Sequence, residues 1–254
     1  MTMIDRSALV VGATGTTGRR VASRLWSQNV PVRCGSLDAL PPFDRQDRRT
    51  WAPALAGAGA VCISDPALDP AAIETLARLA VAAGTERLVL VRGRADDAAL
   101  GAEERFHAAA PAGTVLRHSR LAQEFSEGRL AEGVARGEVV LDARDAAAEA
   151  FVDADDVADV AVAALTEDRH RGRTYELTGP RLLHAADAIA EIAAVLGRPV
   201  RVTAEEPGAA APGSGEPVCH GVDLALGRPA RDFVAFARAA KAAGAWAAPS
   251  PAAA

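Results

Sequence analysis

The sequence is poor in several residues on which common folds and chemistries depend. Its 254 residues include a single tyrosine and three cysteines, and only one of the 28 basic residues, Lys241, is a lysine. The cysteines, Cys34, Cys62 and Cys219, form no CxxC pair, which argues against a disulfide framework. The five histidines show no HExxH or other metal-ligand spacing. We therefore predict neither a disulfide scaffold nor a metal site.

Long apolar runs and an excess of positive charge are also absent. Gly, Asp or Arg interrupts each apolar run well before membrane-spanning length, and residues 1–7, MTMIDRS, lack the blocks of a signal peptide. We therefore expect a cytoplasmic protein that does not enter a membrane. The formal net charge is −5 and the basic residues are dispersed, so nucleic-acid binding is not expected. A homodimer stays open, because nothing in the sequence fixes the oligomeric state.

What the chain does have is a glycine-rich turn close to its start, in residues 9–20, LVVGATGTTGRR. An apolar strand is predicted over residues 4–11 and a helix over residues 16–26. A second strand, predicted over residues 30–34, follows at the distance of a βαβ unit. A glycine turn alone also closes ordinary strand-to-helix junctions, but this context is typical of dinucleotide-binding domains.

Each glycine of the turn has a separate physical role. Gly12 permits the tight turn, Gly15 lets the backbone approach a pyrophosphate, and Gly18 lets the helix pack closely on the strand. The phosphates would lie over the N–H groups at the positive end of the helix. Further hydroxyl donors are available from Thr14, Thr16 and Thr17.

Strands and helices continue to alternate along the chain. Strands are predicted over residues 60–63, 87–91 and 114–117. Helices are predicted over residues 71–83 and 103–110, before an amphipathic stretch over 119–135. This alternation predicts an α/β fold with a doubly wound, largely parallel Rossmann sheet and right-handed crossovers.

After residue 140 the pattern is less regular. A short strand near residue 151 precedes a helix for which Asp153 or Asp155 is the candidate cap. The segment RTYELTGP then predicts a strand and turn, and the next helix ends at Gly197 and Pro199.

These patterns divide the chain into three predicted parts. Residues 1–150 are predicted to form the Rossmann domain. Residues 151–248 are predicted to form a small C-terminal α/β subdomain, which faces the substrate and is interleaved with the Rossmann domain. This subdomain includes a helix over residues 231–246, whose Phe233 and Phe236 are expected to pack in a core. Residues 204–217 are expected to form a mobile connection, and residues 249–254 a disordered tail.

Three further segments resemble the NmrA-like atypical short-chain dehydrogenases. They are FDRQDRRTWAPALAGAGAVCISDP at 43–66, LRHSRLAQEFSEG at 116–128, and FVDADDVADVAVAAL with YELTGP within 151–180. Within the family, the sequence is most similar to the ergot-alkaloid iminium reductase type and its bacterial relatives. The resemblance extends to about residue 202 and resumes at residues 227–237. It implies a cofactor of the NADP or NAD type.

The resemblance assigns the pyrophosphate to Gly12, Thr14, Gly15 and Gly18. It also places Asp44, near the third strand, beside the adenine. Arg33, in the second strand, could reach a 2′-phosphate with the help of Arg19, whereas Asp38 could instead receive a ribose hydroxyl. We expect NADP, with NAD as the alternative.

Several positions depart from the family pattern. Arg92-Gly93-Arg94 stands where relatives commonly have serines beside the nicotinamide, Arg120 replaces an aromatic residue, and His118 replaces a proline. The chain is also shorter than its relatives between residues 202 and 221. The resemblance implies a substrate pocket walled by Arg92, Arg94, His118, Arg120, Leu121 and Phe125. Its guanidinium groups predict an acidic or oxygen-rich ligand, unless Arg92 and Arg120 point to solvent or to Glu124.

The single tyrosine and the single lysine limit the reductions that the chain can catalyse. Short-chain dehydrogenases that reduce ketones use a tyrosine with a lysine four positions on, and neither Tyr175 nor Lys241 has such a partner. Hydride transfer to an iminium, enone or quinone needs little protonation and no such pair. The candidate catalytic residues are then His118, His107 and Arg92.

Two functions follow from this inventory. The first is an NADP-dependent reductase of a small, cyclic or conjugated substrate in secondary metabolism, such as antibiotic biosynthesis. The second is a non-redox dinucleotide-binding protein of the same fold, either an NADP sensor or a repurposed cyclase or isomerase.

Overall fold

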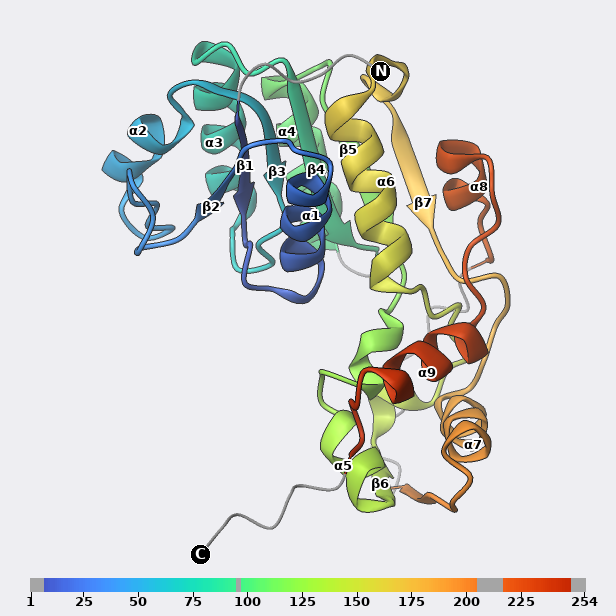
Figure 1. The fold of residues 1–254 in the computed structure, drawn as a ribbon. Coiled ribbons are helices and arrows are strands. Elements are labelled where there is room, and N and C mark those ends of the chain that lie inside the picture. Colours follow the sequence, from blue (N-terminus) through green and yellow to red (C-terminus); the bar gives the residue numbers. More distant parts are fainter. Residues whose placement is uncertain (1–6, 95–96, 205–216, 248–254) are drawn as a thin grey trace, which may run out of the picture. The chain divides into compact units, whose positions relative to one another are not determined.

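The computed structural model describes residues 7–94, 97–204 and 217–247. The chain forms two compact units (Figure 1). The first unit contains Met1–His118, Ala154–Leu177 and Gly221–Arg228, and the second contains Ser119–Asp153, Thr178–His220 and Pro229–Ala254. The predicted mobile connection, apart from its end residues 204 and 217, and the predicted tail lie outside the described residues. So do the first three residues of the strand predicted over 4–11.

The first unit is built on a six-stranded parallel sheet with the order β2-β1-β3-β4-β5-β7. Its strands are β1 (Ser7–Val11), β2 (Val32–Gly35), β3 (Ala58–Ile63), β4 (Arg87–Gly93), β5 (Thr114–His118) and β7 (Thr174–Leu177). This sheet confirms the predicted α/β Rossmann fold. The strand order reverses at β1, which has β2 on one side and β3 on the other. Open sheets of this kind bind ligands at the carboxyl ends of the strands beside such a reversal.

Helices cover both faces of this sheet (Figure 1). They are α1 (Thr16–Ser27), α2 (Trp51–Leu55), α3 (Pro70–Ala82), α4 (Asp97–Ala109), α6 (Ala154–Thr166) and α8 (Gly221–Leu226). Side chains of α2, α3 and α4 share one buried core with Leu9, Val61 and Leu90 of the sheet. On the other face α1 packs against α6. Among the described helices, none is both long and apolar enough to cross a membrane.

Local sequence signals explain where several of these helices begin. Asp69 precedes α3, and its carboxylate accepts a hydrogen bond from the Ala72 amide at 2.7 Å. Pro70 is the first residue of that helix, where its missing N–H costs nothing. Because α6 begins at Ala154, Asp153 directly precedes it and Asp155 falls inside its first turn.

The second unit contains a two-stranded parallel sheet formed by β6 (Glu138–Leu141) and β8 (Arg201–Ala204). Its helices are α5 (Ala131–Arg136), α7 (Ala185–Leu196) and α9 (Phe233–Ala242). Its aromatic core contains Phe125, Phe151, Phe233, Phe236 and Trp246. The predicted core packing of Phe233 and Phe236 is therefore confirmed, as is the end of α7 at Gly197, which has a φ of +73°.

Two parts of the chain are divided more finely than the sequence pattern indicates. The amphipathic stretch 119–135 contains a 3-10 turn, Ala122–Phe125, followed by α5. The amides of Glu127 and Gly128 both bond back to the Gln123 carbonyl, which ends the first turn. The two units do not follow the predicted boundary at residue 150. Ser119–Asp153 belong to the second unit, whereas α6 and β7, within Ala154–Leu177, belong to the first unit, where β7 pairs with β5.

Candidate functional site

The glycine-rich turn links the carboxyl end of β1 to α1. Gly12 has a φ of +82°, and a Cβ there would lie 2.8 Å from the backbone of Ser64. The Gly15 amide donates to the Gly12 carbonyl at 3.0 Å and closes the turn. A Cβ on Gly18 would lie 2.1 Å from that same carbonyl oxygen. The turn and the helix thus approach so closely that Gly12 and Gly18 have no room for a side chain.

The first turn of α1 is open to an anion. Gly15 is the N-cap residue, no side chain caps the helix, and no acidic residue lies in its first turn. Thr14 and Gly15 are exposed, Thr16 is half-buried and Thr17 is buried. Helix N-termini with uncapped N–H groups attract phosphates through those donors and the helix dipole. A pyrophosphate fits this arrangement.

The segment after β3 also belongs to this site, and its place after a central strand is the single feature of the sequence that points to it. The Ser64 amide donates to the Val11 carbonyl at 3.0 Å, and the Gly12 backbone lies directly against Ser64 and Asp65. The Asp65 carboxylate accepts from the Ala67 amide at 2.9 Å. The carboxyl ends of β1 and β3 therefore form one continuous edge around the turn.

Arg33 does not reach this edge in the structure. It pairs with Leu9 in the middle of β1, and its Nη2 donates to the carbonyl of Ala56 at 3.1 Å. Ala56 lies just before β3 begins, which is the amino end of the sheet. Burial lowers the pKa of this guanidinium. At the carboxyl end of β2, Asp38 is instead exposed.

Asp44 lies in the connection between β2 and α2, and its groups support that connection. Its carboxylate accepts from the Gln46 amide at 2.8 Å. Its carbonyl accepts from the indole Nε1 of Trp51 at 2.7 Å. The described contacts of Asp44 are therefore those of a structural turn.

Arg94 belongs to a network of ion pairs at the carboxyl ends of β4, β5 and β7. Its Nε lies 3.2 Å from Glu176, and only 9% of its side chain is exposed. Arg117 bonds both to the buried Glu103, at 2.6 Å, and to Glu176, at 2.7 Å. Hydrogen bonding to Glu103 raises the pKa of Arg117. Glu176 thus neutralises Arg94, which is not available as a free anion-binding group.

Arg92 lies beside this network but does not take part in it. Its half-buried guanidinium donates through Nη1 to the carbonyl of Leu68 at 3.3 Å. Leu68 lies in the loop between β3 and α3. In the part of the chain that the structure describes, no carboxylate lies within ion-pair distance of Arg92.

The two candidate histidines lie at opposite ends of the sheet. His118 is the last residue of β5, and its carbonyl accepts from the Arg94 amide at 2.9 Å. His107 is near the end of α4, and its Nε2 lies 3.4 Å from the hydroxyl of Thr174, the first residue of β7. The structure therefore brings His118, but not His107, to the edge that holds the glycine turn.

The remaining predicted pocket residues belong to the second unit. Arg120 pairs with Asp145 at 3.0 Å, and its guanidinium carbon lies 5.5 Å from the centre of the Phe151 ring. Glu124, the partner considered from the sequence, is farther away at 4.0 Å. Leu121 forms a β-bridge with Val152. Phe125 is fully buried in the aromatic core, because its ring packs edge-on against Phe151 and Phe233.

The tyrosine and the lysine have separate partners. The Tyr175 hydroxyl lies 2.9 Å from Nδ1 of His170 in the first unit. The Lys241 amine donates to the Val195 carbonyl at 2.7 Å in the second unit. Neither contact resembles the proton-donating pair of ketone reductases.

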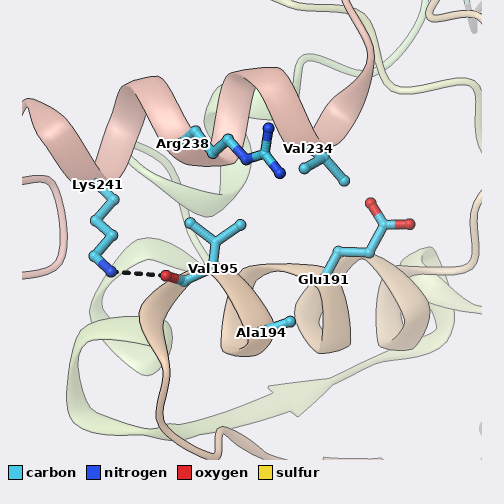
Figure 2. A pocket seen from close by; sticks show the side chains of 6 residues that line it. All are labelled: Glu191, Ala194, Val195, Val234, Arg238 and Lys241. Atoms are coloured by element: carbon cyan, nitrogen blue, oxygen red, sulfur yellow. Dashed lines mark hydrogen bonds between the residues drawn. The ribbon is translucent and has the colours of Figure 1, made fainter.

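The second unit has a cavity of about 470 Å³ between α7 and α9 (Figure 2). It is lined by Glu191, Ala194, Val195, Val234, Arg238 and Lys241. Glu191 is paired with Arg181, and Lys241 with a carbonyl of α7. None of the predicted site residues lines this cavity.

Comparison with known proteins identifies the family. No family model matches the chain. The (4-alkanoyl-5-oxo-2,5-dihydrofuran-3-yl)methyl phosphate reductase of Streptomyces griseus subsp. griseus is 35% identical over 215 residues, which cover 76% of this chain and 75% of that protein. The chain belongs to the NAD(P)-binding Rossmann reductases of the NmrA-like short-chain dehydrogenase type.

Two further proteins are similar to almost the whole chain. The NAD(P)H azoreductase of Xenophilus azovorans is 29% identical and covers 91% of this chain and 96% of its own. Among solved structures, the triphenylmethane reductase of Citrobacter sp. complexed with NADP(H) gives a TM-score of 0.69 at 19% identity. It covers 91% of this chain and 99% of its own, and it supports the fold.

Proposed function

We propose that the protein is an NAD(P)H-dependent reductase that transfers hydride to an activated C=C, C=N or quinone group of a small molecule. The observation that carries the proposal is the uncapped N-terminus of α1 behind a glycine turn without room for side chains, at the reversal point of the sheet. Relatives named as reductases support it.

The residues present fit an NADP or NAD cofactor. The turn from Gly12 to Gly18 would hold the pyrophosphate through backbone N–H groups, with exposed Thr14 and half-buried Thr16 as further donors. When bound in its reduced form, the nicotinamide supplies the hydride. The carboxyl ends of β3, β4 and β5 then provide the neighbouring wall of the site, where His118 is the candidate proton carrier.

The proposed class of hydride acceptor follows from the absence of a paired tyrosine and lysine. Tyr175 is held by His170 rather than by a lysine, so unactivated ketones lack their usual proton donor. An enone, iminium or quinone carbon is already electrophilic, and the protein mainly has to orient it. The Streptomyces relative acts, by its name, on a 5-oxo-2,5-dihydrofuran that carries a methyl phosphate. We therefore propose a cyclic secondary metabolite as the substrate. Both a dihydrofuranone of this kind and the iminium compounds implied by the ergot-alkaloid resemblance belong to this class.

Steady-state loss of NADPH and NADH absorbance tests this proposal against four acceptors. The panel contains a 4-alkanoyl-dihydrofuranone, a benzoquinone, a cyclic iminium and, as control, an unactivated cyclohexanone. We expect turnover of at least one activated acceptor at a rate at least about 100-fold above cyclohexanone, because cyclohexanone is not activated and the tyrosine and lysine pair that protonates ketones is missing. Tight nucleotide binding without turnover of any acceptor would instead favour a nucleotide sensor or a non-redox enzyme.

A second measurement concerns the choice of nucleotide. Arg33→Ala is expected to change the Kd of NADPH and of NADH by less than about threefold, because the guanidinium bonds to Ala56 at the amino end of the sheet. Isothermal titration calorimetry with both nucleotides gives the two constants. A selective loss of NADPH affinity of tenfold or more would show that Arg33 turns to the 2′-phosphate after all.

A further inference from the structure

We propose that Arg92 binds an anionic group of the substrate, and that the natural acceptor carries a phosphate ester. The inference rests on the proposed reductase function and adds the residue that selects the substrate. Its basis is the pairing of charges at the carboxyl ends of β4, β5 and β7, where Arg94 and Arg117 have carboxylate partners and Arg92 has none among the described residues.

The three guanidinium groups differ in their partners. Register places Arg92 directly opposite Arg117 on β5, and Arg117 opposite Glu176 on β7. Arg117 pairs with both Glu103 and Glu176, and Arg94 pairs with Glu176. Among these described residues, Arg117 and Arg94 thus have carboxylate partners, whereas Arg92 is bonded to a carbonyl.

The one described bond of Arg92 does not neutralise that charge. A carbonyl oxygen at 3.3 Å is a neutral and rather distant acceptor. A half-buried guanidinium gains more from an oxyanion, which it can bind through two parallel N–H···O bonds. Carboxylate and phosphate both match this planar fork. The phosphate ester is chosen because the Streptomyces relative acts, by its name, on a methyl phosphate.

The position of Arg92 assigns the anion to the substrate rather than to the adenosine half of the cofactor. In sheets of this kind the adenosine ribose is read at the end of the strand next to β1, which here is β2. Arg92 lies on the other side of β1, at the end of β4. Two strand spacings, about 10 Å, separate β4 from β1.

A purely structural role is the competing explanation. The bond to Leu68 could simply anchor the loop between β3 and α3. Arg171 offers a matched control, because its Nη1 also donates to a carbonyl, that of Glu86 at 3.1 Å, at the amino end of the sheet. Arg92→Gln keeps an N–H donor for Leu68 but removes the charge, whereas Arg92→Lys keeps the charge and loses the fork.

The test measures binding and turnover of matched ligands. The probes are (4-alkanoyl-5-oxo-2,5-dihydrofuran-3-yl)methyl phosphate, the corresponding alcohol, and a carboxymethyl analogue. Calorimetry with the NADP⁺ complex gives the Kd of each probe, and NADPH oxidation gives kcat and KM. Arg92→Gln is expected to lower the preference for the phosphate over the alcohol by about 10- to 100-fold, Arg92→Lys by less, and Arg171→Gln not at all.

The outcomes separate this proposal from the proposed function. An unchanged preference in Arg92→Gln overturns the role of Arg92, even if the wild type reduces both probes. Equal wild-type affinity for the phosphate and the alcohol overturns it as well. Selective binding of the carboxymethyl analogue would show that the substrate carries a carboxylate, and it would overturn the phosphate ester. Selective phosphate binding that Arg92→Gln abolishes, without any NADPH oxidation, supports the anion site but contradicts the reductase function. If Arg92→Gln also loses affinity for NADPH, Arg92 contacts the cofactor rather than the substrate, and the proposal is overturned.

Discussion

Replacing Gly15 with valine is expected to weaken the binding of both NADPH and NADH by at least about 100-fold, which corresponds to about 3 kcal/mol. Gly15 is exposed at the start of α1, where the pyrophosphate would meet the first N–H groups of the helix. A bulky side chain there holds the phosphates away from these donors. Losing two hydrogen bonds to a charged group, each worth about 1.5 to 3 kcal/mol, accounts for the effect.

The fold itself should tolerate this change. Gly15 has a φ of −74°, which other residues also adopt. A Cβ added at Gly15 would lie 3.3 Å from its nearest neighbour, the carbonyl oxygen of Gly12. We expect the free energy of unfolding to stay within about 1 kcal/mol of the wild type. Gly101→Val in α4 is the matched control, because a Cβ at Gly101 meets no atom within 4 Å. Calorimetry of both variants decides the point: undiminished nucleotide affinity in Gly15→Val would show that the site is elsewhere.

Gly18→Ala is expected to have the largest effect on stability, a loss of about 3 kcal/mol or more in the free energy of unfolding. The added Cβ would lie 2.1 Å from the Gly12 carbonyl oxygen and 2.7 Å from its carbon, both of which are backbone atoms. Neither can move without opening the turn, so nucleotide binding should fall as well.

The same substitution at another helical glycine should have the opposite sign. Gly101→Ala lies in α4 with open space around its Cβ, and alanine is favoured over glycine within a helix by about 1 kcal/mol. Urea unfolding of the two variants therefore gives shifts in opposite directions. If Gly18→Ala unfolds at the wild-type urea concentration, α1 does not approach the turn as closely as the structure shows.

The parts of the fold that the sequence predicted are those fixed by neighbouring residues. The helix expected over residues 16–26 is α1, Thr16–Ser27, and the turn before it has the geometry for which Gly12 and Gly18 were singled out. The helix expected over 71–83 is α3, Pro70–Ala82, because Asp69 and Pro70 mark its start. Caps, turns and apolar periodicity act within a few residues, so one sequence is enough to find them.

The parts that escaped prediction depend on distant partners. Strands β6 and β8 are short and pair across about 60 residues of chain, which no local pattern reveals. Arg33 carries the charge that a 2′-phosphate would need, but its side chain bonds to the carbonyl of Ala56, which is 23 residues away along the chain. Arg94 and Arg120 are typical anion-binding residues, yet Glu176 and Asp145, far along the chain, neutralise them. The contact of His107 with Thr174 likewise joins residues that lie 67 positions apart.

The division of the chain into three segments for each unit has a consequence for how this protein can diversify. The backbone passes from one unit to the other five times, after His118, Asp153, Leu177, His220 and Arg228. Neither unit is therefore encoded by one uninterrupted stretch, and a single recombination event or truncation cannot exchange or remove the second unit. New substrate ranges on this scaffold are therefore expected from changes within the existing segments, such as the exchange of one residue at the end of β4 or a change in loop length, rather than from the acquisition of a module.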